Sequence, residues 1–229
     1  MFRRDYFMRQ IEQLTVTLHR ILFHKDQLQI AEAQRLLEEA SRHVLGLNVH
    51  SLYALSSKDI LEFLTYQGSL DSGKALIVAD LFREQGDLYV TSGEPEEAYA
   101  YHLKSLELLF ELYNLDDEDQ TEIRQESCPR IEAVIERLSG WFIPAPIKLS
   151  LFAFYESRGR YSKAEDVLFH YIEDAGEKES VLQEAIMFYK RLLAKDEKDL
   201  QAGNFTAEEA VTGLEQLKQK YHAEENPSV

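Results

Sequence analysis

The fold is decided by residues 79–109, which read ADLFREQGDLYVTSGEPEEAYAYHLKSLELL. Apolar and small residues recur at helical spacing on both sides of a break at residues 91–94. Gly93 suits the positive φ at which many helices end, and Pro95 suits the first turn of a following helix. We therefore expect two helices joined by a tight turn.

Small residues predict where these two helices cross. Gly86 and Ala98 lack bulk, so the two backbones can approach closely at these positions. Phe82 and Tyr89 would then fill the space on either side of the crossing. The order of small and large residues thus predicts a closely packed helical hairpin.

A second hairpin is indicated further along the chain. Tyr155, Gly159 and Ala164 each lie 66 residues beyond the tyrosine, glycine and alanine of the first hairpin. Another pair of helices would fit between the two hairpins, near Asp119–Glu126 and Pro129–Ser139. The chain therefore has the pattern of a repeat protein.

Composition supports an all-α fold. The 229 residues include 45% hydrophobic residues, enough for a substantial core in one or two domains. Only 10 Gly and 5 Pro interrupt the helical patterns, and no long run alternates apolar and polar residues as a sheet would. We expect a chain built from helices.

The charge is strongly acidic and uneven. The formal net charge is −16, which argues against nucleic acid as a partner because binding to phosphates needs a basic face. Residues 1–45 carry seven Lys or Arg and six Asp or Glu, so nearly all of the negative charge lies after residue 45. Such a surface serves solubility in general, and it favours a basic partner.

An amphipathic helix is expected over residues 5–24. Its apolar side chains advance in steps of four and three, as in a narrow coiled-coil seam, and they are Phe7, Ile11, Leu14, Leu18 and Ile21. Three interpretations stay open: packing on the next helix, pairing with a second copy as a homodimer, or lying on an anionic membrane.

The other segments complete the expected organisation. Helices are predicted over 27–44, 58–66 and 181–193, a polar loop over 195–204, and a capping box from Thr206 to Glu209 that opens the last helix. The connector Trp141–Pro146 either packs in the core or forms an exposed contact patch. We expect residues 1–70 to pack on repeats at 71–222, followed by a disordered tail at 223–229.

The sequence lacks the spacings that catalysis or metal binding would need. No phosphate-binding glycine loop, nucleophile elbow or paired histidine motif is present, and the single cysteine, Cys128, excludes an internal disulfide. We expect no enzyme activity, no metal and no cofactor. No apolar run approaches the ~20 residues of a membrane span, so a cytoplasmic protein is expected.

The two hairpins resemble the tetratricopeptide repeat, a helix-turn-helix unit of roughly 34 residues. The resemblance covers residues 70–222, with departures at Phe152 and His102, and the Lys and Asn set that binds a terminal carboxylate in some relatives is absent. It implies a right-handed superhelix of stacked hairpins, about nine or ten helices in all. It also implies a concave groove lined by first-helix side chains: Asp80, Arg83, Asp87, Val90, Thr91, Leu149, Ala153, Glu156 and Ser157.

The opening residues carry another resemblance. Residues 4–14, RDYFMRQIEQL, are similar to those of a bacterial family of unknown function, which implies no activity. The leading hypothesis is a non-enzymatic module that binds a peptide or helix in its groove. The alternative is a structural protein that self-associates through its N-terminal helix.

Overall fold

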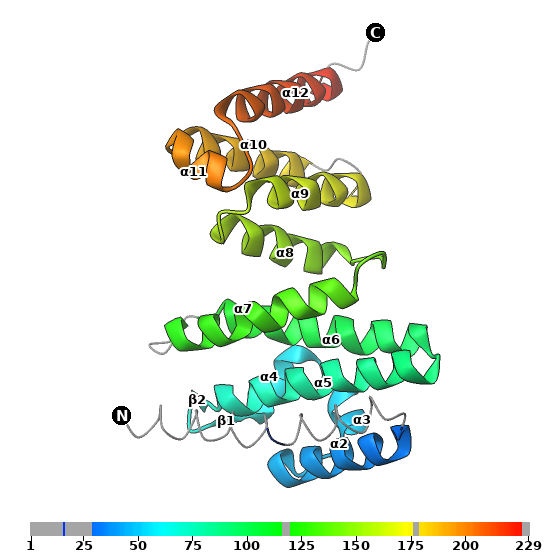
Figure 1. The fold of residues 1–229 in the computed structure, drawn as a ribbon. Coiled ribbons are helices and arrows are strands. Elements are labelled where there is room, and N and C mark those ends of the chain that lie inside the picture. The colour runs from blue at the N-terminus through cyan, green and yellow to red at the C-terminus, as the bar shows by residue number, and fades with distance from the viewer. Residues whose placement is uncertain (1–15, 17–28, 116–119, 176–178, 226–229) are drawn as a thin grey trace. The chain divides into compact units, whose positions relative to one another are not determined.

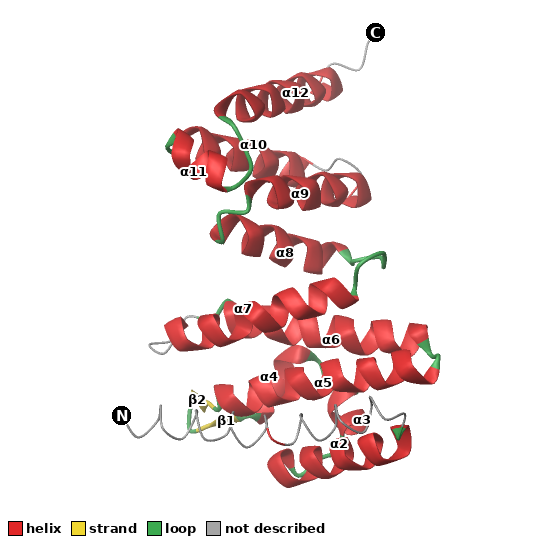
Figure 2. Cartoon of the chain, viewed as in Figure 1, coloured by secondary structure: helices red, strands yellow, loops and turns green. Residues whose placement is uncertain are grey.

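The computed structural model describes residues 16, 29–115, 120–175 and 179–225. This part of the chain forms eleven helices and one short pair of strands (Figure 1, Figure 2). The all-α expectation is therefore confirmed. Two compact units divide between Phe142 and Ile143, within the region in which the sequence predicted repeats.

The first unit is organised around one long, buried helix, α5 (Ser72–Ser92), which α2, α3, α6 and α7 all contact. Fourteen of the 21 residues of α5 are buried. The other described elements of the unit are α2 (Ile30–Leu45), α3 (Val49–Tyr53), α4 (Ser57–Phe63), β1 (Thr65–Tyr66), β2 (Ser69–Leu70), α6 (Pro95–Tyr113) and α7 (Gln120–Arg137).

The helix predicted over 58–66 ends early, at Phe63. Ser56 caps its start by accepting a hydrogen bond from the Asp59 amide. At its end the chain instead turns through Gln67 and Gly68, both with positive φ, and pairs β1 with β2. A two-residue turn of this kind matches the twist of a β-hairpin, which is why the strands replace the last helical turn.

The α5–α6 hairpin forms as predicted. Gly93 takes a φ of 79°, and the Glu94 amide donates to the Tyr89 carbonyl oxygen at 2.9 Å. A Cβ on Gly86 would lie 2.4 Å from His102 Cδ2 and 3.1 Å from the Ala98 carbonyl oxygen. The absence of a side chain at Gly86 therefore allows the close helix crossing.

The prediction of two separate helices near 119–126 and 129–139 is wrong, because α7 continues through Pro129 as one helix. Its apolar side chains form a stripe across the proline, with Ile123, Ile131 and Val134 all buried. Proline removes one backbone hydrogen bond from a helix interior. Packing of this stripe against α6 outweighs that loss.

The second unit contains α8 (Ala145–Ser157), α9 (Tyr161–Ala175), α10 (Glu179–Leu193), α11 (Glu197–Ala202) and α12 (Ala207–Glu225). The loop predicted over 195–204 is partly wrong, since α11 forms there and buries Leu200. The predicted capping box is confirmed: the Glu209 amide donates to Thr206 Oγ1, and the Thr206 amide donates to the Glu209 carboxylate.

The connector between α7 and α8 exposes its aromatic side chains. Trp141 and Phe142 both lie on the surface. Tyr99 stacks on the Trp141 ring at a centroid distance of 5.0 Å and donates its hydroxyl hydrogen to the Phe142 carbonyl oxygen. Of the two interpretations of this connector, core packing is wrong for these two residues.

Candidate functional site

The central helix α5 carries charged side chains into the interior of the first unit. Asp80, Arg83, Glu84 and Asp87 recur at steps of three, one and three, which places them on one face of the helix. Asp80 is 3% exposed and Glu84 is 1% exposed. Charged groups this deeply buried need partners of opposite charge, because removal from water costs several kcal/mol per ion.

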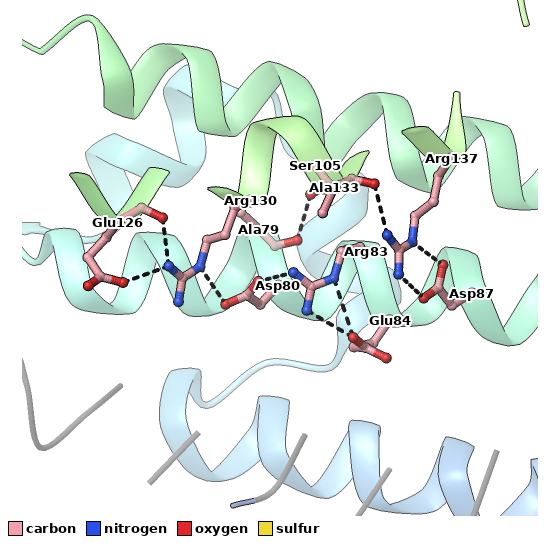
Figure 3. Close-up of polar contacts among 10 residues, drawn as sticks. All are labelled: Ala79, Asp80, Arg83, Glu84, Asp87, Ser105, Glu126, Arg130, Ala133 and Arg137. Carbon is pink, nitrogen blue, oxygen red and sulfur yellow. Dashed lines mark hydrogen bonds and ion pairs between the residues drawn. The ribbon is translucent and has the colours of Figure 1, made fainter. Parts of the chain in front are cut away.

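Arginines of α7 supply part of this compensation (Figure 3). Arg130 Nε donates to Asp80 Oδ2 at 2.9 Å. Arg137 holds Asp87 through two parallel hydrogen bonds, Nε to Oδ1 at 2.7 Å and Nη2 to Oδ2 at 2.8 Å. The two acids lie seven residues apart on α5 and the two arginines seven apart on α7, so the helices pair in register over two turns.

Arg83 links the acids along α5 itself. Its Nη1 lies 2.8 Å from Asp80 Oδ1, and its Nη2 donates to Glu84 Oε1 at 2.9 Å. The carboxylate of Asp80 therefore lies between two guanidinium groups, those of Arg83 and Arg130. We refer to Asp80, Arg83, Glu84, Asp87, Arg130 and Arg137 as the charge cluster.

A histidine from α6 joins the charge cluster. His102 is buried, and its Nε2 lies 2.9 Å from Asp87 Oδ1. The same ring lies against Gly86 of α5. His102 therefore packs at the crossing of α5 and α6 and places a polar ring nitrogen next to Asp87.

The arginines of α7 also satisfy backbone groups of their own helix. Arg130 Nη1 donates to the Glu126 carbonyl oxygen at 2.7 Å, close to Pro129 in the interior of the helix. Arg137 Nη1 donates to the Ala133 carbonyl oxygen at 2.8 Å. Each guanidinium group therefore binds a carbonyl oxygen one turn earlier in α7 and a carboxylate of α5. These two contacts fix its orientation.

The surroundings keep these arginines charged. Burial alone lowers the pKa of Arg83 and Arg130, but the neighbouring acids outweigh burial and the net pKa shift is upward. The hydrogen bonds from Arg137 to Asp87 raise the pKa of Arg137 despite burial. Permanently charged guanidinium groups cannot exchange protons with a substrate near neutral pH. The arrangement is typical of an ion-pair network that fixes how helices pack.

The structure separates the groove residues that the sequence predicted. Asp80, Arg83 and Asp87 belong to the charge cluster, and Thr91 Oγ1 donates to the Asp87 carbonyl oxygen. Val90, in contrast, is 59% exposed.

In the second unit, Leu149 is 42% exposed and Ala153 is exposed. Glu156 accepts two hydrogen bonds from Arg191, and Ser157 Oγ donates to the Phe154 carbonyl oxygen. The predicted self-association residues Phe7, Ile11, Leu14, Leu18 and Ile21 lie outside the described residues.

Sequence reasoning missed Arg130, Arg137, Glu84 and the role of His102. A signal was present, because acids and arginines with the same seven-residue spacing lie on two expected helical segments. Within the described ranges, no group of three or more His, Cys, Asp or Glu side chains is placed to hold a metal ion. None of the described helices combines the length and apolar character needed to cross a membrane.

The fold and the charge cluster define an all-α protein with ion pairs in its core. A family model described as a family of unknown function (DUF6483) matches residues 1–222, and the chain belongs to this family. This match confirms the expectation, drawn from residues 4–14, that the chain resembles a family of unknown function. No curated protein and no solved structure gives a significant match.

Proposed function

We propose that this chain is a non-enzymatic, cytoplasmic interaction module that binds a basic peptide or helix on a tetratricopeptide-like groove. The proposal rests on a repeated hairpin turn. In the first unit the Glu94 amide donates to the Tyr89 carbonyl oxygen and the Gly93 amide to that of Val90. The turn after α8 reproduces both bonds 66 residues later.

The second turn matches the first in geometry as well as in bonding. The Arg160 amide donates to the Tyr155 carbonyl oxygen at 2.9 Å, and the Gly159 amide donates to that of Glu156 at 3.0 Å. Gly159 has a φ of 68°, close to the 79° of Gly93. Repeated helical hairpins of this kind commonly present extended binding surfaces to other proteins.

The residues assigned to partner contact are the groove positions that the fold does not use. Asp80, Arg83 and Asp87 have ion-pair partners inside the chain, so we exclude them. Val90 in the first unit, and Leu149 and Ala153 in the second, are exposed apolar residues at positions that the repeat resemblance assigns to a groove. Exposed apolar side chains within an acidic surface suit an amphipathic, basic partner.

Affinity capture from a bacterial lysate tests this proposal. The chain serves as bait at low and at moderate salt, and mass spectrometry identifies what elutes. One stoichiometric protein that survives moderate salt supports the proposal, provided that Val90→Glu or Leu149→Glu in the bait removes it. Capture that neither substitution weakens contradicts the proposed contact residues.

The same capture tests the alternative, self-association through the N-terminal helix. If only bait is recovered and its mass in solution is doubled, self-association replaces groove binding as the proposal. Leu14→Glu should then make the protein monomeric. An unchanged mass for that variant rejects the alternative.

A further inference from the structure

A cavity of about 560 Å³, widely open to solvent, lies among α9, α10 and α12 of the second unit. Its volume falls within the roughly 300–1,000 Å³ typical of ligand pockets in proteins. Glu165 and Phe169 of α9 line it one helical turn apart, and Gly213 of α12 lies among the residues lining it from that helix. None of these residues belongs to the charge cluster.

Tyr189 and Gly213 pack closely together in the lining of this cavity. Tyr189 of α10 is fully buried, and its hydroxyl donates to Glu165 Oε1 at 2.5 Å. A Cβ on Gly213 would lie 2.4 Å from the Tyr189 ring. The absence of a side chain at residue 213 therefore brings α12 against the ring, and the packed tyrosine fixes the Glu165 carboxylate.

The cavity is negatively charged. Glu208 and Glu209 line it together with Glu165. Burial raises the pKa of the Glu165 carboxyl and the charges of Asp166 and Glu209 raise it further, while the Tyr189 hydrogen bond lowers it. The carboxylate thus lies in a negative electrostatic field.

Two basic side chains of the second unit are engaged with other acids. Lys148 pairs with Asp174, and Arg191 pairs with Glu156 and Glu184. Within residues 143–175 and 179–219, no Lys or Arg is recorded in an ion pair with Glu165, Glu208 or Glu209. Glu209 accepts hydrogen bonds from Thr206, and Glu165 accepts one from Tyr189. A cationic group of a partner would add a contact of opposite charge to these carboxylates.

We propose that this cavity receives an arginine side chain of a partner peptide. A guanidinium can form paired hydrogen bonds with a carboxylate and at the same time stack on an aromatic ring. The cavity offers carboxylates and the partly exposed ring of Phe169. This proposal rests on the proposed interaction function and adds the chemistry of one contact to it.

Binding of a fluorescein-labelled (Arg-Gly)3 peptide tests the assignment. Fluorescence anisotropy compares it with the citrulline version, which has nearly the same shape without the charge, on the full chain. Glu165→Gln keeps an acceptor for the Tyr189 hydroxyl, and Glu208→Gln changes an exposed rim residue. Glu173→Gln, an exposed acid on α9 outside the cavity lining, is the matched control.

We expect the citrulline peptide and each cavity variant to lose about tenfold in affinity, with the Glu173→Gln chain unchanged. Equal affinities across the four proteins, or no binding of the arginine peptide at millimolar concentration, overturn the assignment. If the lysate partner is still captured by a Glu165→Gln, Glu208→Gln chain, the cavity assignment fails while the interaction function stands. If the unaltered chain captures nothing, the interaction function itself fails.

Discussion

Arg137 and Asp87 join two helices across fifty residues of sequence by a two-point hydrogen bond, with distances of 2.7 Å and 2.8 Å. Arg130 and Asp80 are also separated by fifty residues. The equal separations mean that α5 and α7 can pair both acids with both arginines only in one register. A shift of either helix by one residue would leave two buried carboxylates without these partners.

Arg137→Met should therefore destabilise the fold. Methionine keeps much of the apolar stem, so the main loss is the compensation of the Asp87 charge. We expect a decrease of about 2 kcal/mol in the free energy of unfolding, because the guanidinium itself is partly exposed. Urea denaturation measures this loss. The control is Arg35→Met, because Arg35 is exposed and pairs with Glu32 on the surface of α2. A loss of stability in Arg35→Met as large as that in Arg137→Met would contradict the account.

Gly86→Ala should be destabilising, although alanine normally stabilises a helix interior by ~1 kcal/mol relative to glycine. The new Cβ would overlap the His102 ring, so His102 would have to leave Asp87. We expect a net loss of about 1–3 kcal/mol in thermal or urea unfolding. A His102→Ala background removes the overlap, so Gly86→Ala should be neutral or stabilising in that background. An equal loss of unfolding free energy in both backgrounds would rule out this explanation.

The repeated turn predicts matched effects at two distant glycines. Gly93 and Gly159 both have positive φ at the end of a helix, where a Cβ adds strain. Gly93→Ala and Gly159→Ala should each cost about 1 kcal/mol of unfolding free energy. Asparagine at either position should cost less. A clear effect at one glycine with none at the other would argue against equivalent turns.

Glu165→Gln should change how stability depends on pH. The pKa of Glu165 in the folded chain lies above its ordinary value of 4.5, so the ionised carboxylate lowers the stability of the fold at neutral pH. This penalty disappears as pH falls below the unfolded-state pKa. The variant should be more stable than the unaltered chain at pH 7, and the difference should shrink towards pH 4. A difference that does not vary between pH 7 and pH 4 contradicts the raised pKa.

Local signals in the sequence predicted the hairpin and the caps well. Gly93, Pro95 and the pair Thr206 and Glu209 act through the backbone of their own helices, so neighbouring residues alone determine their role.

The failures of prediction depend on residues far away in the sequence. Pro129 signals a helix end, yet packing against α6, with Ile131 and Val134 buried, keeps α7 continuous. The resemblance to the tetratricopeptide repeat implied that the acids of α5 line a groove, but the sequence of α5 does not show which residues cover that face of the helix. Arg130 and Arg137, fifty residues later, supply that cover.

The central claim is that a partner contacts the exposed apolar groove positions. Isothermal titration of the captured partner against the Val90→Glu, Leu149→Glu and Val211→Glu chains tests it most directly, because Val211 is also exposed, at 43%, but lies on α12 outside the expected groove. We predict that the first two substitutions weaken binding by about tenfold or more and that Val211→Glu leaves the affinity unchanged. Equal affinity for all three variants and the unaltered chain would contradict the claim.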